Sequence, residues 1–497
     1  MSATSSRVPR SRSRSRGGFE WGSLFPGLTL LVLCVALSFG GATHGDALSS
    51  AVVRLASLPL LGAAVWRLAK VRQPPRVQAA ILLLCAIIAV PLIQLIPLPP
   101  QLWSLLPGHW FLIADYRAAG IAPPWLPVSL APYETADALP WLAPPSAMFL
   151  ATLSLASAER RRMVLAVPLF ALLAVALGIA QVAGGDESPL RFYAVTNVHF
   201  AVGFFANKNH QASLLLVAAA LAPLWVTAFR NVDRQRGRFG LFLAIAIELV
   251  LIVGIGVSGS RAGVLLAIPA ILGGALIVLV QGGGKAFRRS AAAMLVAGAV
   301  GTGLVGVFAS TTYIVERFQS PLRAELRVQV MPAIEHSAEA FLPVGSGLGS
   351  FDRIYPMFEP IGAVSDGYLN HAHNDFLELW LETGAFGLIL IGTFLLWWFW
   401  TTLRLWRRRR QPPQDGVRPA ASLVIGLLLA HSLVDYPLRT AALATLFALA
   451  CGILAAPADS ASGPLAARGR RPENADGIST AAFETDSTLT AASATPV

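Results

Sequence analysis

Twelve apolar runs, each long enough or nearly long enough to cross a bilayer, limit the folds open to this chain more than any other feature. Of its 497 residues, 55% are hydrophobic and 13% are charged, which is far more apolar than a water-soluble domain requires. The sequence therefore predicts an all-α polytopic membrane protein with about twelve transmembrane helices. The runs lie at roughly 24–43, 48–69, 77–97, 140–157, 163–183, 209–229, 240–257, 262–281, 290–309, 386–405, 419–435 and 440–456.

Basic clusters occupy alternate loops between these runs. A net charge of +11 would suit a nucleic-acid partner, but short clusters between apolar runs are typical of topology signals. We therefore expect no nucleic acid as a partner, and we expect both termini in the cytoplasm. The clusters are Lys70/Arg72/Arg76, Arg160–Arg162, Arg230/Arg234/Arg236/Arg238, Lys285/Arg288/Arg289 and Arg404/Arg407–Arg410.

The chain divides into a membrane domain between two polar tails. Residues 1–20 interleave arginine with serine and predict a disordered, basic cytoplasmic tail. Residues 21–456 form the predicted membrane domain, in which 310–384 is a large external loop, and 457–497 form a second disordered cytoplasmic tail. The cysteines Cys34, Cys85 and Cys451 lie inside apolar runs, without the spacing of a disulfide framework or a thiolate metal site.

The polar motifs lie on the predicted external side of the membrane, and the central one is His371–Gly387. Asn374 or Asp375 is the predicted N-cap of a helix, and Asp375 with Glu378 has the spacing of a capping box. His371 and His373 then lie beside a helix N-terminus, which favours an anion. An imidazole able to accept a proton near neutral pH would stand at that anion site. The alternative is that both histidines are polar residues at a wet membrane edge.

Two further polar groups fall on the same predicted face. Asn207–His210 precede the sixth run, where a simple helix cap would need one asparagine only, so Lys208 and His210 favour function. Arg261 lies in the short turn Ser258–Gly263, where a charge at the membrane edge needs an anionic partner. The alternative for Arg261 is snorkelling to lipid phosphates.

The remaining external segments read as structural. Pro343–Ser350 is glycine-rich and predicts a tight turn, because no strand–helix unit surrounds it as in a nucleotide loop. Ile334, Ala338 and Phe341 predict an amphipathic helix that Pro332 starts or kinks. Pro97–Pro140, with Trp103, Trp110 and Trp125, is typical of an interfacial segment. His431 and Asp435 either pair with each other or with Arg439, or they have a functional role.

We expect no metal site, because no third ligand has a fixed spacing to His371 and His373.

These motifs together resemble the O-antigen ligases and related polysaccharide polymerases, glycosyltransferases of the bacterial inner membrane. The resemblance covers most of the chain between about 25 and 456. Its pieces are Asn207–His210, Ser258–Gly263, Gly345–Phe351, Ala372–Asp375 with Glu382 and Gly384, His431–Pro437, Pro97–Pro100 and Trp125–Leu130.

The resemblance implies a GT-C-type fold, an all-helical bundle whose largest periplasmic loop covers the active site. It implies transfer of a glycan from undecaprenyl diphosphate, with inversion, to a hydroxyl of lipid A–core or of a growing polysaccharide, without a cofactor. The family's essential histidine corresponds to His373 and its turn arginine to Arg261. A second arginine corresponds to Arg327, although Met331 stands where the family has tryptophan.

In this reading His373 is the general base, and Arg261, Arg327 and Lys208 bind the diphosphate, because arginine forks hold phosphate without a cation. The supporting residues are Asn207, Asn209, His210, Asn374, Asp375, Glu382, His431 and Asp435. A twelve-span transporter is an alternative, although Glu248 and Arg54 are the few ionisable residues within its spans. A non-catalytic partner in envelope assembly is a third.

Overall fold

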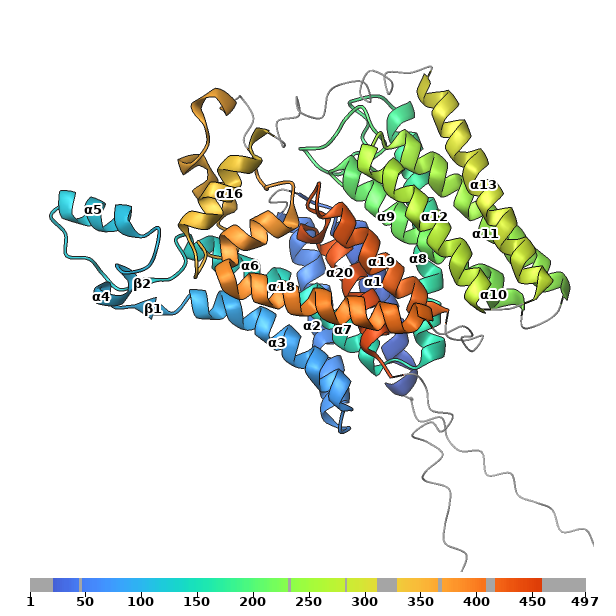
Figure 1. The fold of residues 1–497 in the computed structure, drawn as a ribbon, viewed down its shortest axis with the longest axis horizontal. Helices are drawn as coiled ribbons and strands as arrows, with labels where there is room; N and C mark the ends of the chain where they lie inside the picture. The colour runs from blue at the N-terminus through green and yellow to red at the C-terminus, as the bar shows by residue number, and fades with distance from the viewer. Residues whose placement is uncertain are drawn as a thin grey trace, which may run out of the picture. The chain divides into compact units, whose positions relative to one another are not determined.

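Helices make up almost all of the regular structure in the computed structural model (Figure 1). It describes residues 21–43, 47–230, 234–281, 284–310, 329–364, 369–407 and 416–457. Within these ranges the strands are β1 (Pro97–Leu98) and β2 (Leu126–Pro127), which pair antiparallel with Pro97 opposite Pro127. The helical composition confirms the predicted class, an all-α polytopic membrane protein.

A helix lies within each of the twelve apolar runs. The helices before the large loop are α1 (Trp21–Phe39), α2 (Ala47–Ala69), α3 (Pro75–Gln94), α4 (Pro100–Trp103), α5 (Trp110–Ala118), α6 (Pro132–Trp141), α7 (Ala143–Ser154), α8 (Ser157–Ala183), α9 (Lys208–Leu221), α10 (Leu224–Arg230), α11 (Arg234–Val257), α12 (Arg261–Gln281) and α13 (Lys285–Ser310). After them come α16 (Met331–Ala340), α17 (Phe351–Ile354), the 3-10 helices η2 (Tyr355–Met357) and η3 (Ile361–Ala363), α18 (Asp375–Arg407), α19 (Val417–His431), the 3-10 helix η4 (Pro437–Arg439) and α20 (Ala441–Ala455).

Seven of the helices in the described ranges are long and apolar enough to cross a membrane. Three more, Leu24–Phe39, Val417–His431 and Ala441–Ala455, are apolar but shorter. The count of about twelve spans, the GT-C type and the alternating topology stay predictions. Residues 1–20 and 458–497, which are nearly all of the two tails, and Arg327 lie outside the described residues.

The helix α9 forms the centre of the apolar core. All of its residues from Lys208 to Leu221 are buried, because α8, α11, α12 and α19 pack around it. A helix that is apolar all round is stable only where neighbours cover every side. Its N-terminal end is polar, so this packing fixes Asn207–His210 rigidly at one end of the bundle.

A second, smaller core forms around α16, beside the start of α18. Ile334, Ala338 and Phe341 are buried there together with Phe351 and Tyr355. The predicted amphipathic helix is therefore confirmed, with Pro332 in its first turn, where a proline costs no hydrogen bond. This core packs against Leu381 of α18, so the large loop is held to the helix that carries the central polar stretch.

Candidate functional site

The polar stretch around His373 leads directly into α18, and Asn374 caps that helix. Its Oδ1 accepts hydrogen bonds from the backbone N–H groups of Phe376 (3.0 Å) and Leu377 (3.2 Å). The predicted capping box of Asp375 and Glu378 is wrong. Glu378 instead accepts the backbone N–H of Ala372 through Oε2 at 2.9 Å, so its carboxylate holds the segment before the helix.

His373 has a backbone conformation that non-glycine residues rarely adopt, with φ at 52°. Its Nδ1 lies 3.0 Å from the carbonyl oxygen of His371. A carbonyl can only accept, so Nδ1 carries the proton in the neutral ring and Nε2 carries the lone pair. The site therefore presents the basic nitrogen of His373 in one defined tautomer.

The ring of His371 is held by Glu378. His371 Nδ1 and Glu378 Oε1 are 2.7 Å apart, and the same carboxylate binds the Ala372 N–H. Burial lowers the pKa of His371, but the charge of Glu378 and its hydrogen bond outweigh that effect, so the pKa lies above its usual 6.5. The Glu378 carboxylate thus ties the His371 ring to the backbone N–H of Ala372, directly before His373.

Arg439 from η4 lies among three carboxylates of α18. Its Nη1 is 2.7 Å from Glu382 Oε2 and 3.4 Å from Glu378 Oε1, and its Nε is 3.8 Å from Asp375 Oδ1. Burial alone would lower the pKa of Arg439, but these carboxylates raise it above its usual value. Sequence reasoning missed this role, although Asp375, Glu378 and Glu382 recur at helical spacing and so predict one charged face.

Tyr436 joins the histidines of different motifs. Its ring centroid lies 4.4 Å from that of His371, 5.0 Å from that of His373 and 4.9 Å from that of His210. The side chains of Asn207 and Asn370 hydrogen-bond to it. Burial, with the charge of Asp435, raises the pKa of Tyr436, so it stays a neutral phenol. In the sequence, its position inside the His431–Pro437 motif could have indicated that Tyr436 belongs to the site.

The segment His431–Pro437 lies against α9 and the start of α18. His431 Nδ1 and Ser213 Oγ are 2.7 Å apart, and Asp435 Oδ1 is 4.0 Å from His210 Nε2. Ser432 donates to Asp375 Oδ2 at 2.6 Å. The motif thus contacts α9 and α18, and Arg439 pairs with the carboxylates of α18. A functional role for His431 and Asp435 stays a prediction.

The turn that carries Arg261 touches the start of α9. Arg261 is the first residue of α12, and Ser260 Oγ accepts the Gly263 N–H at 3.1 Å. A β-carbon at Gly263 would lie 2.7 Å from that of Ala212 in α9, so the first turn of α12 contacts the second turn of α9. Both N-terminal ends carry a partial positive charge, and each begins with a cationic residue.

Lys208 is the first residue of α9 and is buried. Its Nζ lies 3.4 Å from the centroid of the Phe200 ring, and a β-carbon at Gly259 would touch the same ring. Asn207 caps the helix, since its Oδ1 accepts the Asn209 N–H at 2.9 Å. Phe200 therefore links the Asn207–His210 motif to the turn before Arg261.

The glycine-rich run is the predicted tight turn, and it docks on α18. Gly345, Gly347 and Gly349 all have positive φ, a conformation that glycine adopts without a steric cost. Gly349 donates its N–H to Glu382 Oε1 at 2.9 Å. The turn therefore holds the same carboxylate that Arg439 binds through its other oxygen.

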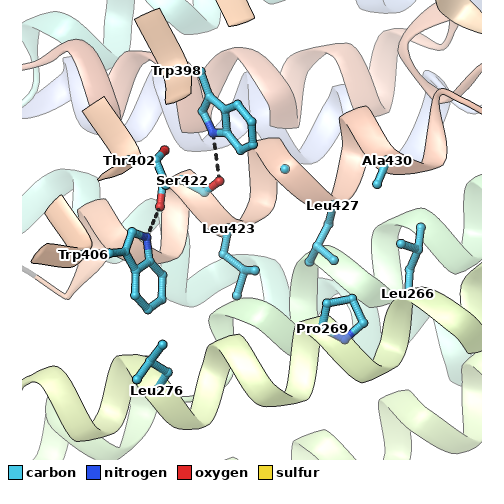
Figure 2. Close-up of a pocket in the computed structure, with 11 residues that line it drawn as sticks. Leu266, Pro269, Leu276, Trp398, Thr402, Trp406, Ser422, Leu423, Leu427 and Ala430 are labelled. Carbon is cyan, nitrogen blue, oxygen red and sulfur yellow. Dashed lines mark hydrogen bonds between the residues drawn. The ribbon is translucent and has the colours of Figure 1, made fainter. Parts of the chain in front are cut away.

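An apolar cavity of about 420 Å³ runs between α12, α18 and α19 (Figure 2). The indoles of Trp398 and Trp406 both donate to Ser422, at 3.1 Å to its carbonyl and 2.9 Å to its hydroxyl. At one end its lining includes Leu266 of α12 and Ala430 of α19. The lining thus ends one residue before His431 in the chain.

Metal ligation finds little support in the geometry. Among the described residues, no group of three or more histidine, cysteine, aspartate or glutamate side chains is arranged to hold a metal ion. Cys34, Cys85 and Cys451 are free thiols. The metal-free mechanism stays a prediction.

Comparison with known families adds one match. Residues 246–392 match the family described as O-antigen ligase. The matched range begins in α11, contains α12 with Arg261, and ends in α18, so it includes His373, Asn374, Asp375 and Glu382. A comparison with curated proteins gives no match. The match supports a family related to O-antigen ligases and polymerases.

Proposed function

We propose that this chain, whose residues 246–392 match the O-antigen ligase family, is an inverting, metal-independent glycosyltransferase. It moves a glycan from undecaprenyl diphosphate to an acceptor hydroxyl at the periplasmic face of the bacterial inner membrane. The acceptor is lipid A–core in a ligase, or a growing polysaccharide in a polymerase. The main support for this proposal is His373 at the start of α18. Its backbone is constrained, and the contact of its Nδ1 with the His371 carbonyl makes Nε2 the basic nitrogen.

His373 acts as the general base. Its Nε2 takes the proton from the acceptor hydroxyl while that oxygen attacks the anomeric carbon, and the bond to the diphosphate oxygen breaks. Proton transfer by a positioned side chain contributes about 10²–10⁴-fold in rate. The hydrogen bond from Nδ1 to the His371 carbonyl stabilises the imidazolium that forms, because a carbonyl dipole favours the charged ring.

The departing diphosphate is stabilised by Arg261 and Lys208, with Arg327 as a second fork. Arg261 and Lys208 begin α12 and α9, so each adds a full charge to the partial charge of a helix N-terminus. The first turn of α12 packs against α9 through Gly263 and Ala212, so the two helices that carry these cations are neighbours. Charge stabilisation of this kind, in a site that excludes water, usually lowers the activation barrier more than any other single effect.

The carboxylates around Arg439 have a different role, because an anion would be repelled by them. Asp375, Glu378 and Glu382 are matched with Arg439 and, through Glu378, with His371. The other supporting residues are also buried, namely Asn209, His210, Asn374, His431 and Asp435. We assign these groups to positioning: they hold the His371–Asn374 segment against Tyr436 and so fix the direction of His373.

The cavity between α12, α18 and α19 suits the isoprenoid part of the donor. Its lining is apolar apart from Thr402 and Ser422, and Ser422 is engaged by the two indoles. Its volume falls within the range of pockets that take small molecules. A donor whose diphosphate lies near Arg261 can pass its tail along this cavity towards the opposite leaflet.

A transporter is the second candidate, and Glu248 favours it. This carboxylate is 2% exposed within α11, and ionisable residues inside spans often mark ion pathways.

One assay separates the transferase from the transporter. Purified protein in proteoliposomes is incubated with lipid-linked glycan and either lipid A–core or a glycan acceptor. Glycan transferred to lipid A–core indicates a ligase, and a longer lipid-linked chain indicates a polymerase.

If the His373→Ala variant forms no product, the transfer activity belongs to this site. Full transfer in EDTA is expected, whereas activity lost in EDTA and restored by a divalent ion would overturn the metal-free mechanism. Movement of intact lipid-linked glycan without a new glycosidic bond would support the transporter. No transfer and no movement, with every acceptor offered, would leave the non-catalytic assembly role.

A further inference from the structure

Residues 95–130, between α3 and α6, form a small unit with its own core. The pairing of β1 with β2 closes its ends. Trp103 is completely buried inside it, and the indole donates to the Pro124 carbonyl at 2.9 Å. His109 is also buried, with Nε2 3.1 Å from the Val128 carbonyl. Burial lowers the pKa of His109, although its contacts with the Pro107 and Val128 carbonyls oppose that effect.

This unit is joined tightly to the candidate site. Gln94, the last residue of α3, donates to the Glu382 carbonyl at 2.8 Å and accepts the Leu348 N–H at 3.0 Å. A β-carbon at Gly108 would overlap the Phe341 ring, so the unit also lies in contact with the core of the large loop. Movement of residues 95–130 is therefore coupled to the turn that binds Glu382.

The unit exposes large apolar side chains. Leu105 is 78% exposed, Trp110 74% and Trp125 65%. Such exposure is unfavourable in water by about 25 cal/mol per Å² of apolar surface. Asp115 and Arg117 of α5 carry opposite charges, so no net charge directs the unit towards an anionic or cationic partner.

The exposed surface continues the lipid-facing side of α3. That helix is a candidate span in which few residues are buried, and Leu92 and Ile93 near its end are more than half exposed. Ile96 and Leu102 are also more than half exposed, with one exposed polar residue, Gln101, between them. Tryptophan prefers the boundary between headgroups and acyl chains.

We propose that residues 102–125 insert Leu105, Trp110 and Trp125 into the headgroup–acyl boundary of the leaflet in which α3 ends. The unit is an interfacial anchor of fixed shape, and its occupant is lipid. Through Gln94 it sets the depth, relative to the bilayer surface, of the Gly345–Gly349 turn that binds Glu382. This inference goes beyond the proposed transfer reaction and does not depend on it.

The test measures depth directly by spin labelling. Single cysteines are placed at Trp110 and Trp125 in full-length protein whose Cys34, Cys85 and Cys451 are replaced by alanine, and the labelled protein is reconstituted in phosphatidylethanolamine–phosphatidylglycerol vesicles. Collision with oxygen, which partitions into lipid, is compared with collision with a water-soluble nickel chelate. Leu92→Cys in α3 is the lipid control, and Asp186→Cys, in an exposed loop, is the aqueous control.

At positions 110 and 125 we expect nickel collisions severalfold below those at 186 and oxygen collisions above them, approaching those at 92. Nickel access equal to that at 186 would overturn the proposal. Low collision rates with both reagents would also overturn it, because they would indicate cover by a protein or a second copy. If the alanine background fails to fold, a fluorescent unnatural residue at 110 in the native chain, quenched by brominated lipid, gives the same decision.

Discussion

The two parts of α18, before and after Gly384, carry opposite kinds of side chain on one helix. Before Gly384 lie Asp375, Glu378 and Glu382, all buried and matched by Arg439. After Gly384 the helix is uncharged until Arg404, and Trp398, Thr402 and Trp406 line the apolar cavity. Gly384 has a φ of 59° and ψ of −144°, so the helix is interrupted there.

This difference follows from the length of the helix. At 1.5 Å per residue its 33 residues would extend about 50 Å, whereas the hydrocarbon core of a bilayer is about 30 Å thick. One part must therefore leave the hydrocarbon, and the charged part is the one for which that is favourable. The interruption at Gly384 allows it to turn from the span and pack on the large loop. We infer that the first part serves chemistry and the second serves the lipid.

The strongest test of this division removes the chemistry alone. His373→Ala should reduce glycan transfer by about 10²–10⁴-fold, the contribution of a positioned general base, while binding of the lipid-linked donor stays close to wild type. His336→Ala is the matched control, because this histidine is exposed on α16, and it should retain activity. Initial rates of glycan transfer in proteoliposomes compare the two variants with the wild type. Normal transfer by His373→Ala would remove the catalytic assignment.

A second test asks whether the charges of the first part depend on one cation. Arg439→Met leaves three buried carboxylates without their guanidinium and should destabilise the protein by about 3–5 kcal/mol, as breaking a buried pair does. Arg353→Met is the control, since Arg353 pairs with Glu134 at an exposed position and such pairs contribute little. Unfolding midpoints in detergent compare the two. Equal midpoints would show that Arg439 is not the centre of the cluster.

Much of this arrangement follows from local sequence patterns. The apolar runs predicted the helices, and the spacing of Ile334, Ala338 and Phe341 predicted the buried face of α16. The repeated glycines of Gly345–Gly349 predicted a turn. Each of these depends on neighbours in the chain, because helical periodicity and turn chemistry are local properties.

The contacts that join separate segments did not follow from the sequence. Nothing in the order of residues shows that Tyr436 meets the rings of His210, His371 and His373. The partners of Arg439 depended in the same way on how η4 packs against α18. Glu378 was assigned to a capping box because its spacing allowed one, but the backbone before α18 turns so that Ala372 presents its N–H instead.

Gly384 provides a sharper test of the boundary between the two parts. An alanine there would need a positive φ, and its β-carbon would overlap the Pro343 carbonyl oxygen. Gly384→Ala should therefore cost about 1–3 kcal/mol of stability, as strained residues do. Gly392→Ala, in open space on the same helix, should be neutral or slightly stabilising. If thermal unfolding finds the two variants alike, the interruption at Gly384 is not a structural requirement.

The second part can be tested by filling its cavity. Leu423→Trp adds volume beside Trp398 and Trp406, so the KM for the lipid-linked donor should rise severalfold while kcat changes little. Leu396→Trp, on an exposed face of α18, is the control and should leave both constants unchanged. A fall in kcat at unchanged KM would contradict the division, because it would connect the cavity with the chemical step.

The smallest expected effect concerns the pH dependence of stability at the start of α18. Glu378 holds the pKa of His371 above its usual 6.5, so the folded state binds the proton more tightly than the unfolded chain does. That contribution is complete below about pH 6.5 and is lost as the pH rises through the folded pKa. The unfolding midpoint of the wild type should therefore fall between pH 6.5 and alkaline pH by more than that of His371→Gln, which cannot titrate. Equal slopes for the wild type and His371→Gln would mean that folding does not raise the proton affinity of His371, and that its contact with Glu378 adds no pH-dependent stability.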